Sequence, residues 1–525
     1  MLDAIFDYFT DEHTRQILFL LRIAFFATVA FFLLRIAFQR IRGPRHREYR
    51  VRLALLLVIA AFLGIYAYQA NWQLAGFLNP RFVLFMERYN PRPDNPVANL
   101  NRGRILDVNC RPLAMTTPGV KGFRSYPEGA ATAHIVGYRH PLYGMMGMER
   151  AADSVVCGYV FNPTSRTDLA RIGHTILQEQ RDVGNDLLLT LDADLQHKAL
   201  DLFTEKGFLG AAVALDPRDG SIRLLATAPS FDPNAFDPQL NRDSRLPLLN
   251  RAIQGRYPPG STFKLAIAAL AIETGHAVTL DCPASGYFAP GARKAIHDHE
   301  FYENPSWPGF GTLDIHKAFA KSSNTYFARA GVLSGTAAFN DLAEGLCIND
   351  SIPLYESPTG NRIASAKGSV PVLGTGKAAL RELSQLSIGQ GRLLVTPLHV
   401  AMLGAAIAND GVLYRPRLSE TEEPEVLSTP LRPATAAKVR GLMREAVQSG
   451  TGRKADIQGL DVGGKTGTAQ NPHGKSHGWF ICMAPVSAPK LVVAVVVENQ
   501  GYGSQTAVPI ATELLKTAQE LGYFE

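Results

Sequence analysis

Ser261 and Lys264 stand three residues apart in a turn rich in glycine and proline, directly before the apolar segment 265–272. This segment is apolar on every side, which predicts a buried helix that starts at the pair. Burial lowers the pKa of a lysine, so that a neutral amine can accept the proton of a neighbouring serine hydroxyl. The N-terminus of the helix also favours negative charge that develops beside Ser261. The pair is therefore a candidate nucleophile and base for acyl transfer.

The Ser-x-x-Lys spacing arises easily by chance, and the chain contains a second match at Ser487 and Lys490. Pro489 breaks any helix at that point, and the match lies between two strand-like segments. We therefore expect a hairpin turn there. The spacing alone does not identify a site, so Ser261 needs further elements beside it.

Two such elements follow in a fixed order. Residues 322–324 (Ser-Ser-Asn) lie between two helical patterns, and residues 465–468 (Lys-Thr-Gly-Thr) precede two strand-like segments, 477–483 and 491–497. Serine and asparagine also cap helices, so the first element has a purely structural alternative. Glycines make the second element a candidate bulged edge strand, along which a substrate strand can still lie. The three elements together are far more specific than any one of them.

Ser-x-x-Lys, Ser-x-Asn and Lys-Thr-Gly in this order resemble the active-site motifs of penicillin-binding proteins and class A β-lactamases. Other segments resemble class B penicillin-binding proteins in particular. These segments are 102–107, 144–149, 189–192 with 195–196, 215–217 with Gly220, 387–391 and 395–398. The Glu-Asp-x-x-Phe motif that marks the glycosyltransferase module of class A relatives does not occur in the chain.

The resemblance implies an α+β fold in three parts. We expect a membrane anchor over residues 1–72 and a β-rich pedestal, similar to the dimerisation domain of penicillin-binding proteins, over 73–195. We expect a penicillin-binding transpeptidase domain over 196–525, similar to the β-lactamases in having an antiparallel sheet flanked by helices. The last helix, about 508–521, is expected to pack on this sheet.

The resemblance also implies a role for each matching residue. Ser261 is expected to be the nucleophile and Lys264 the base of acylation. Ser322 is expected to relay a proton between the lysines and the leaving amine. Asn324 is expected to hold the peptide amide of the substrate and to orient Lys264.

The third motif is expected to bind the end of the substrate. The resemblance implies that Lys465 supplies positive potential, and that Thr466 and Thr468, on either side of Gly467, bind the terminal carboxylate of a D-Ala-D-Ala stem peptide. The backbone N–H groups of Ser261 and Thr468 are expected to form the oxyanion hole. No cofactor is expected.

The activity implied by the resemblance is that of a peptidoglycan D,D-transpeptidase, which cross-links stem peptides through a serine acyl-enzyme and is inhibited covalently by β-lactams. Two alternatives remain open. A D,D-carboxypeptidase or β-lactamase-type hydrolase activates water for deacylation, but the Glu-x-x-Leu-Asn element that class A β-lactamases use for this is absent from the chain. A β-lactam-binding sensor acylates once, but such a sensor has no use for residues 73–195.

Two apolar segments near the start of the chain predict transmembrane helices at 17–34 and 53–69. A cleaved signal peptide is the alternative for the second, but no small residue stands three positions before a cut after Ala70. The loop between them holds seven arginines against Glu48, a local excess of +6 that equals the formal charge of the whole chain. This excess predicts a cytoplasmic loop and an extracytoplasmic (periplasmic) catalytic domain at the bacterial inner membrane, and no nucleic-acid surface.

The remaining polar groups do not indicate a metal. Residues 297–300 (His-Asp-His-Glu) have ligand types, but an exposed polar loop is the favoured interpretation, and no metal is predicted. The five cysteines leave at least one thiol free, and their spacing assigns no pair. Because the chain has a cross-linking site and no recognisable polymerase, the resemblance implies a partner. We expect a membrane-embedded glycan polymerase of the shape, elongation, division and sporulation group.

Overall fold

The computed structural model describes residues 102–116, 124–140, 142–157, 184–304, 306–471 and 474–525, together with positions 53, 57–58, 60–65 and 67–68. The chain divides into two compact units, residues 1–89 and residues 90–525, which are described separately.

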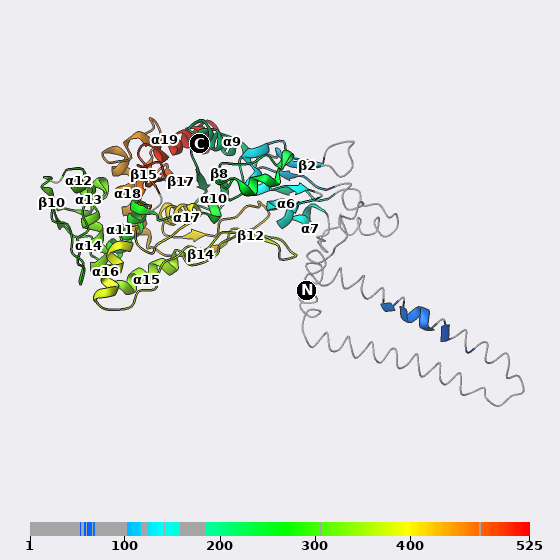
Figure 1. Cartoon of the computed structure of the whole chain (residues 1–525), viewed down its shortest axis with the longest axis horizontal. Coiled ribbons are helices and arrows are strands. Elements are labelled where there is room, and N and C mark those ends of the chain that lie inside the picture. Colours follow the sequence, from blue (N-terminus) through cyan, green and yellow to red (C-terminus); the bar gives the residue numbers. More distant parts are fainter. Residues whose placement is uncertain are drawn as a thin grey trace, which may run out of the picture. The chain divides into compact units, whose positions relative to one another are not determined.

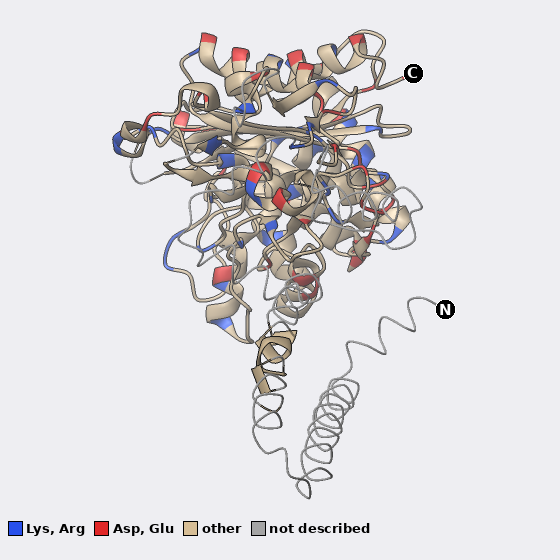
Figure 2. Ribbon diagram, turned by 90° about the vertical axis from the view of Figure 1, so that its right-hand side faces the viewer, with Lys and Arg blue, Asp and Glu red and all other residues tan. Residues whose placement is uncertain are grey.

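In the first unit the described positions are helical, and the ribbon in Figure 2 shows no charged residue among them. Their larger apolar side chains are exposed, among them Phe62 (70%) and Leu63 (63%). No helix among the described residues is long and apolar enough to cross a membrane. The predicted span 17–34 and the loop that follows it lie outside the described residues.

The centre of the second unit is a five-stranded antiparallel sheet with the order β15-β16-β17-β7-β8. The strands are β7 (Gly210–Leu215), β8 (Ile222–Ala228), β15 (Gly463–Ala469), β16 (His477–Ala484) and β17 (Leu491–Val497). The middle strand β17 is almost purely β-branched and is buried along its whole length. A strand of this kind needs cover on both faces of the sheet.

Helices supply that cover (Figure 1). On one face lie α9 (Ala193–Glu205) and α19 (Ala507–Glu520), whose apolar side chains form one core with alternate residues of the strands. On the other face lie α17 (Pro397–Ala408), buried at every residue, and α18 (Pro433–Gln448). The sheet is therefore the middle layer of three.

A helical lobe adjoins the β15 edge of the sheet. Its central helix, α11 (Lys264–Glu273), is apolar on all sides and buried from Lys264 to Ala271. It is enclosed by α18 and by three helices of the lobe itself, α13 (Ile315–Lys321), α14 (Asn324–Ser334) and α15 (Thr336–Gly345). A further helix of the lobe, α16 (Lys377–Leu386), packs on α14. The sequence expectation of a buried helix after Ser261 is confirmed.

The part of the chain before α9 forms a smaller sheet with the order β3-β2-β1-β6. Its strands are short: β1 (Ile105–Leu106), β2 (Pro112–Thr116), β3 (Arg124–Ser125) and β6 (Leu187–Leu188). Beside them lie α5 (Ala133–Val136), α6 (Gly147–Ala151) and α7 (Asp153–Val156). The expected domain boundaries at 72/73 and 195/196 stay predictions.

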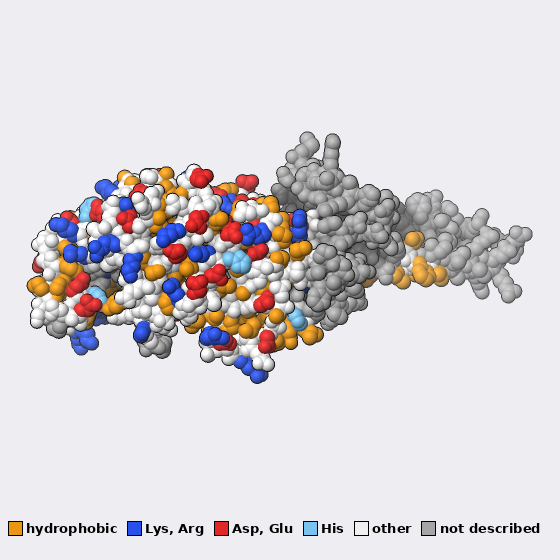
Figure 3. Space-filling model, turned by 90° about the horizontal axis from the view of Figure 1, so that it is seen from above, with side chains coloured by type: hydrophobic (Ala, Val, Ile, Leu, Met, Phe, Trp, Pro, Cys, Tyr) orange, Lys and Arg blue, Asp and Glu red, His pale blue; other side chains and the backbone are white. Residues whose placement is uncertain are grey.

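The expected α+β class is confirmed, and so is the interpretation of the second Ser-x-x-Lys match. Ser487 and Lys490 lie in the connection between β16 and β17, outside any helix. All five cysteines are free thiols. Figure 3 shows acidic and basic side chains interspersed over the face that it presents.

Candidate active site

Ser261 lies in a short 3-10 turn, η4 (Gly260–Phe263), that leads directly into α11. Gly260 begins this turn with φ +55, a conformation that favours glycine. A Cβ atom on Gly260 would lie 2.7 Å from the carbonyl oxygen of Thr468, so a larger residue would push the turn away from β15. The Gly260 N–H also donates to the carbonyl oxygen of Gly389 over 2.9 Å. Glycine is therefore required where the nucleophile turn meets the edge strand.

The segment before Ser261 is fixed from several sides. The indole N–H of Trp479 on β16 donates to the carbonyl oxygen of Pro258 over 3.1 Å. The hydroxyl of Tyr257 donates to Glu498 over 2.6 Å. A Cβ atom on Gly467 would meet the Thr262 methyl group at 2.9 Å. The turn that carries Ser261 thus packs directly against the Lys-Thr-Gly strand, and the serine itself is only partly buried.

Lys264 occupies the first turn of α11 and is fully buried. Its Nζ donates to the backbone oxygen of Ser322 over 2.5 Å and to Oδ1 of Asn324 over 2.8 Å. Burial lowers the pKa of Lys264 to about 7, against a smaller opposing effect of the negative charges of Asp298 and Glu300. A substantial fraction of Lys264 is therefore a neutral amine near neutral pH, which is the form that accepts a proton.

The hydroxyl of Ser322 lies between the two lysines. Nζ of Lys465 donates to Ser322 Oγ over 2.8 Å, and Nζ of Lys264 lies 3.3 Å from the same oxygen. Lys465 is also fully buried, and burial together with the charge of Lys264 lowers its pKa well below the ordinary value. Two buried amines that share one hydroxyl make a short path for protons.

The chain reaches this geometry through a tight joint between α13 and α14. Ser322 caps the C-terminus of α13 in the left-handed conformation, with φ +56. The next residue, Ser323, caps α14 by accepting the N–H of Tyr326 over 3.1 Å. This segment therefore caps α14 through Ser323 and also contacts Lys264 through Ser322 and Asn324.

The hydroxyl of Thr466 contacts the hydroxyl of Thr451, which lies just after α18. Thr468 is partly exposed, next to the turn that carries Ser261. All eight residues expected from the sequence thus lie on four neighbouring elements, η4, α11, the α13–α14 joint and β15. Thr451 was missed because an exposed threonine after a helix carries no sequence signal.

Known proteins resemble the chain in sequence and in structure. Residues 210–516 match the family described as penicillin binding protein transpeptidase domain. The chain belongs to the class B penicillin-binding proteins. The peptidoglycan D,D-transpeptidase PbpA of Mycolicibacterium smegmatis is 32% identical over 444 residues, which are 76% of this chain and 84% of that protein. MrdA of Haemophilus influenzae, also named a peptidoglycan D,D-transpeptidase, is 28% identical over 459 residues, 75% of this chain and 68% of that protein.

Solved structures agree with this family. The imipenem acyl-enzyme complex of penicillin-binding protein A from M. tuberculosis superposes with a TM-score of 0.70 at 29% identity. The match covers 80% of this chain and 99% of that one. The relative forms an acyl-enzyme with a β-lactam on the same fold.

One expectation about the site of this penicillin-binding protein is wrong. Residues 297–300 were expected to form an exposed polar loop, but Asp298 is buried, with 1% of its surface exposed. Its Oδ1 accepts the N–H of Thr325 over 3.1 Å, and no hydrogen-bond partner of Oδ2 is found among the described residues. The loop is polar in sequence, yet α14 covers this one carboxylate.

A second contact joins the two flanks of the site. The imidazole Nε2 of His299 lies 3.0 Å from the hydroxyl of Tyr502, in the segment between β17 and α19. A Cβ atom on the next residue, Gly503, would lie 2.5 Å from the carbonyl oxygen of Gly467. The Tyr502 segment therefore runs beside the Lys-Thr-Gly strand, and His299 reaches it from the Asn324 side. The separation of 203 positions between His299 and Tyr502 conceals this contact in the sequence.

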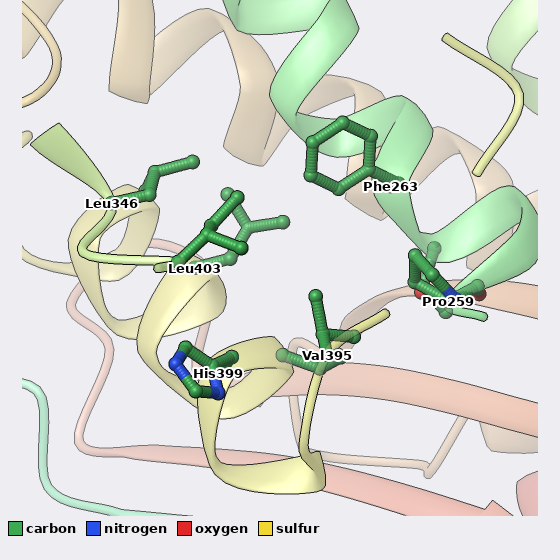
Figure 4. Close-up of a pocket in the computed structure, with 9 residues that line it drawn as sticks. Pro259, Phe263, Leu346, Val395, His399 and Leu403 are labelled. Carbon is green, nitrogen blue, oxygen red and sulfur yellow. The ribbon is translucent and has the colours of Figure 1, made fainter. Parts of the chain in front are cut away.

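A small apolar cavity lies behind the nucleophile turn and is separate from the lysine cluster (Figure 4). Phe263 and Pro259 line it from the turn, and His399 and Leu403 line it from α17. Burial lowers the pKa of His399 to about 4, so its ring is neutral near neutral pH. The cavity contains neither Ser261 nor a lysine, so we assign it to packing. Among the described residues there is no group of three or more His, Cys, Asp or Glu side chains able to hold a metal ion.

Proposed function

We propose that this penicillin-binding protein is a peptidoglycan D,D-transpeptidase that works through an acyl-enzyme on Ser261. The Ser261 oxygen attacks the carbonyl carbon of the penultimate D-alanine of a stem peptide, and its proton passes to Lys264. The bond to the terminal D-alanine breaks, and that amine leaves with a proton delivered through Ser322. An amine of a neighbouring stem then attacks the ester, forming the cross-linking amide and releasing Ser261.

One observation carries this proposal above the others. A fully buried lysine with a pKa of about 7 lies three residues from a partly exposed serine at the start of a helix. Residues three apart at the start of a helix lie on one face, so this spacing suits a neutral amine that activates the serine for acyl transfer. The hydroxyl of Ser322, which contacts both lysines, supports the proton path to the leaving amine.

The other site residues have supporting roles in this proposal. The N–H groups of Ser261 and Thr468 stabilise the oxyanion, and each such donor lowers a barrier by about 3–4 kcal/mol in comparable enzymes. Lys465, Thr466 and Thr468 bind the terminal carboxylate of the stem peptide. Asn324 holds the substrate amide, and Gly467 lets η4 approach β15, because a Cβ there would clash with Thr262.

A fluorescent penicillin tests the nucleophile in the full-length protein. We expect a stable covalent adduct, and we expect Ser261→Ala to abolish it without changing the circular dichroism spectrum. The matched control is Ser487→Ala, which removes the serine of the second Ser-x-x-Lys match and should leave the adduct unchanged. An adduct that survives Ser261→Ala, or one that maps to another residue by mass spectrometry, contradicts the assignment.

Two measurements separate the transpeptidase from its alternatives. A hydrolase, either a carboxypeptidase or a β-lactamase, releases the penicilloyl group within seconds, whereas a transpeptidase retains it. A sensor retains it too, but it does not join a stem peptide to an acceptor amine. We therefore expect slow deacylation together with cross-linking of a synthetic stem pentapeptide.

The same proposal includes a place in the cell and a division of the chain. Residues 1–72 anchor the protein in the bacterial inner membrane by helices at 17–34 and 53–69. The pedestal, 73–195, and the transpeptidase domain, 196–525, then lie in the periplasm. The +6 excess of the arginine-rich loop between the two apolar segments supports this orientation. Reporter fusions after residues 14 and 75 should report the periplasm and a fusion at 45 the cytoplasm; a cytoplasmic signal at 14 reduces the anchor to one helix.

A glycan polymerase is the partner in this proposal, because the chain lacks a recognisable polymerase of its own. Arg22, within the first apolar segment, is costly in lipid unless it is paired, which supports a helix partner in the membrane. Exposed Leu142 (81%) and Tyr143 on the turn after β4 (Arg139–His140) are further candidate contacts. Full-length protein should co-purify with a polymerase of the shape, elongation, division and sporulation group in mild detergent. Protein that starts at residue 73 should not co-purify with the polymerase. If it still does, residues 1–72 only attach the protein to the membrane and do not bind the polymerase.

A further inference from the structure

We propose that Asp298 is a positioning residue of the active site. Its buried carboxylate holds the start of α14 so that the amide oxygen of Asn324 faces Lys264, and it is the counter-charge of Lys264. The inference rests on the proposed role of Lys264 as the acylation base. The segment around Asp298 was not assigned to the site by its sequence.

Three successive residues of one segment hold the start of α14. The carbonyl oxygen of Ile296 lies 3.4 Å from Thr325 Oγ1, and the carbonyl oxygen of His297 accepts Nδ2 of Asn324 over 3.0 Å. Oδ1 of Asp298 accepts the N–H of Thr325 over 3.1 Å. Because Nδ2 of Asn324 is bound to His297, its Oδ1 is left to accept Nζ of Lys264 over 2.8 Å. The segment therefore determines which end of the Asn324 amide meets the lysine.

The carboxylate of Asp298 is unusually placed for a residue that is only structural. It is almost fully buried, one oxygen has a single backbone N–H, and the other has no hydrogen-bond partner among the described residues. A buried carboxylate needs positive charge or further hydrogen bonds nearby. The N-terminus of the eleven-residue helix α14 supplies part of that charge. Lys264 supplies more positive charge, because it contacts Asn324, the residue before Thr325.

The charged groups near Lys264 come from two sides. Lys465 approaches it from β15, and the two share the hydroxyl of Ser322. Asp298 and Glu300 act on it from the segment that enters α12 (His299–Glu303), and of these two Asp298 has the larger effect on the pKa of Lys264. The charges of Asp298 and Arg329 also act on the Cys282 thiol, Asp298 raising its pKa and Arg329 lowering it. Asp298 is buried, whereas Glu300 is partly exposed, so water screens Glu300 more.

A helix cap alone does not account for this arrangement. Ser323 already caps α14 through the N–H of Tyr326, and Asp298 comes from a segment 27 residues away from Thr325. A cap affects stability only. A counter-charge also changes the pH at which Lys264 becomes neutral, and that difference is measurable.

The test measures the acylation rate of full-length protein by a fluorescent penicillin at a series of pH values from about 5 to 9, a range that brackets the expected titration. The rate should rise with pH as Lys264 loses its proton. Asp298→Asn keeps the shape and an oxygen for the Thr325 N–H but removes the negative charge. Protonated Lys264 is then less stable, so its pKa falls and the rise should move to lower pH by roughly one unit.

Two matched variants serve as controls. Asp281→Asn removes a nearby exposed carboxylate from β9 (Leu280–Pro283) and should leave the pH profile unchanged. Glu300→Gln should shift the profile in the same direction by less than Asp298→Asn. Asp298→Glu keeps the charge and should keep the midpoint, even where its longer side chain lowers the plateau rate. If Asp298→Asn does not fold, Asp298→Ser removes the charge with a smaller side chain.

Each outcome decides something definite. If the Asn or Ser variant folds, as judged by circular dichroism, and keeps the wild-type midpoint, Asp298 is not the counter-charge and the inference fails. It fails equally if Asp298→Glu moves the midpoint as far as Asp298→Asn does. If the wild-type protein itself forms no penicillin adduct, the proposed function fails instead, so the two failures are distinguishable.

Discussion

The cluster around Glu149 and the cluster around Lys264 both bury charged side chains, but they balance their charges differently. Glu149 is fully buried between two arginines: Arg102 Nε donates to it over 2.9 Å and Arg124 Nε over 2.6 Å. Asp153 pairs with Arg102 as well. Burial alone would raise the pKa of Glu149, but Arg102 and Arg124 outweigh it and hold the pKa below its ordinary value. In this cluster two carboxylates, those of Glu149 and Asp153, pair with the two guanidinium groups of Arg102 and Arg124.

In the cluster around Lys264, the amines of Lys264 and Lys465 share the hydroxyl of Ser322. One buried carboxylate, that of Asp298, contacts the backbone of Thr325, the residue after Asn324. Burial lowers the pKa of both Lys264 and Lys465. In the first cluster ion pairing outweighs the effect of burial and keeps the side chains charged, whereas in the second burial dominates and favours the neutral amine. A buried charge with matched partners therefore stabilises the fold, whereas a buried lysine with too little counter-charge is prepared to accept a proton.

The largest expected effect is on the rate of acylation. Lys264→Met fills the same buried space without an amine, so Ser261 loses its base. We expect acylation by a fluorescent penicillin to slow by about 10²–10⁴, the usual contribution of a positioned base. Stopped-flow fluorescence gives the rate, and circular dichroism verifies the fold. A folded Lys264→Met variant that acylates at the wild-type rate would contradict the role of Lys264 as the base.

The next largest expected effect is on the stability of the protein, and it comes from the cluster around Glu149. Glu149→Gln leaves Arg124 buried without its ion-pair partner and Arg102 with Asp153 alone, which should lower the free energy of unfolding by about 3–5 kcal/mol. The protein that remains folded should still acylate, because Glu149 lies outside the lysine cluster. Urea unfolding followed by circular dichroism measures the loss.

The matched control for Glu149→Gln is Asp186→Asn, which breaks the exposed pair of Asp186 and Arg104. Exposed pairs contribute about 0–1 kcal/mol, so this variant should be close to the wild type. An equal loss of unfolding free energy in the two variants would contradict the prediction that the buried ion pairs stabilise the fold more than the exposed pair does.

Lys264→Met should also change stability, in the direction opposite to Glu149→Gln. The pKa of Lys264 is about 7 in the folded protein and about 10.4 in the unfolded chain, so between these values the unfolded state binds more protons. The cost of burying Lys264 is therefore complete below about pH 7 and disappears as the pH approaches 10.4. We expect Lys264→Met to stabilise the protein by about 1–4 kcal/mol at neutral pH. Urea unfolding should show this gain shrinking as the pH rises; a gain independent of pH contradicts the assigned pKa.

Much of the site could be predicted from the sequence, because its main parts are local. A Ser-x-x-Lys spacing before an apolar segment specifies one helix turn, and Lys-Thr-Gly before two strand-like segments specifies one strand. The order of the three motifs in the chain also indicated the family. The cap formed by Ser323 and the contacts made by Ser322 and Asn324 were alternatives in the sequence, and the fold satisfies both.

The parts that could not be predicted depend on contacts between distant segments. Asp298 lies in a run of four polar residues, which favours an exposed loop, and only its packing against α14 buries it. His299 begins α12 and Tyr502 lies in the segment between β17 and α19, and the sequence around them carries no shared pattern. The anchor at 17–34 and 53–69 and the roles of the site residues remain predictions.

The smallest expected effect concerns a neutral contact at the edge of the lysine cluster. Thr451 shares a hydrogen bond with the Thr466 hydroxyl, which is proposed to bind the substrate carboxylate. Thr451→Val keeps the shape but frees that hydroxyl to rotate, at a cost of about 0.5–1.5 kcal/mol in substrate binding, or roughly a threefold to tenfold rise in KM. No charge changes, so kcat and the pH midpoint of acylation should stay at their wild-type values. Thr451→Ser restores the hydroxyl and should restore KM. If Thr451→Val instead moves the pH midpoint, neutral hydroxyls help to set the protonation of the lysines, and the division between charge balance and substrate contact must be redrawn.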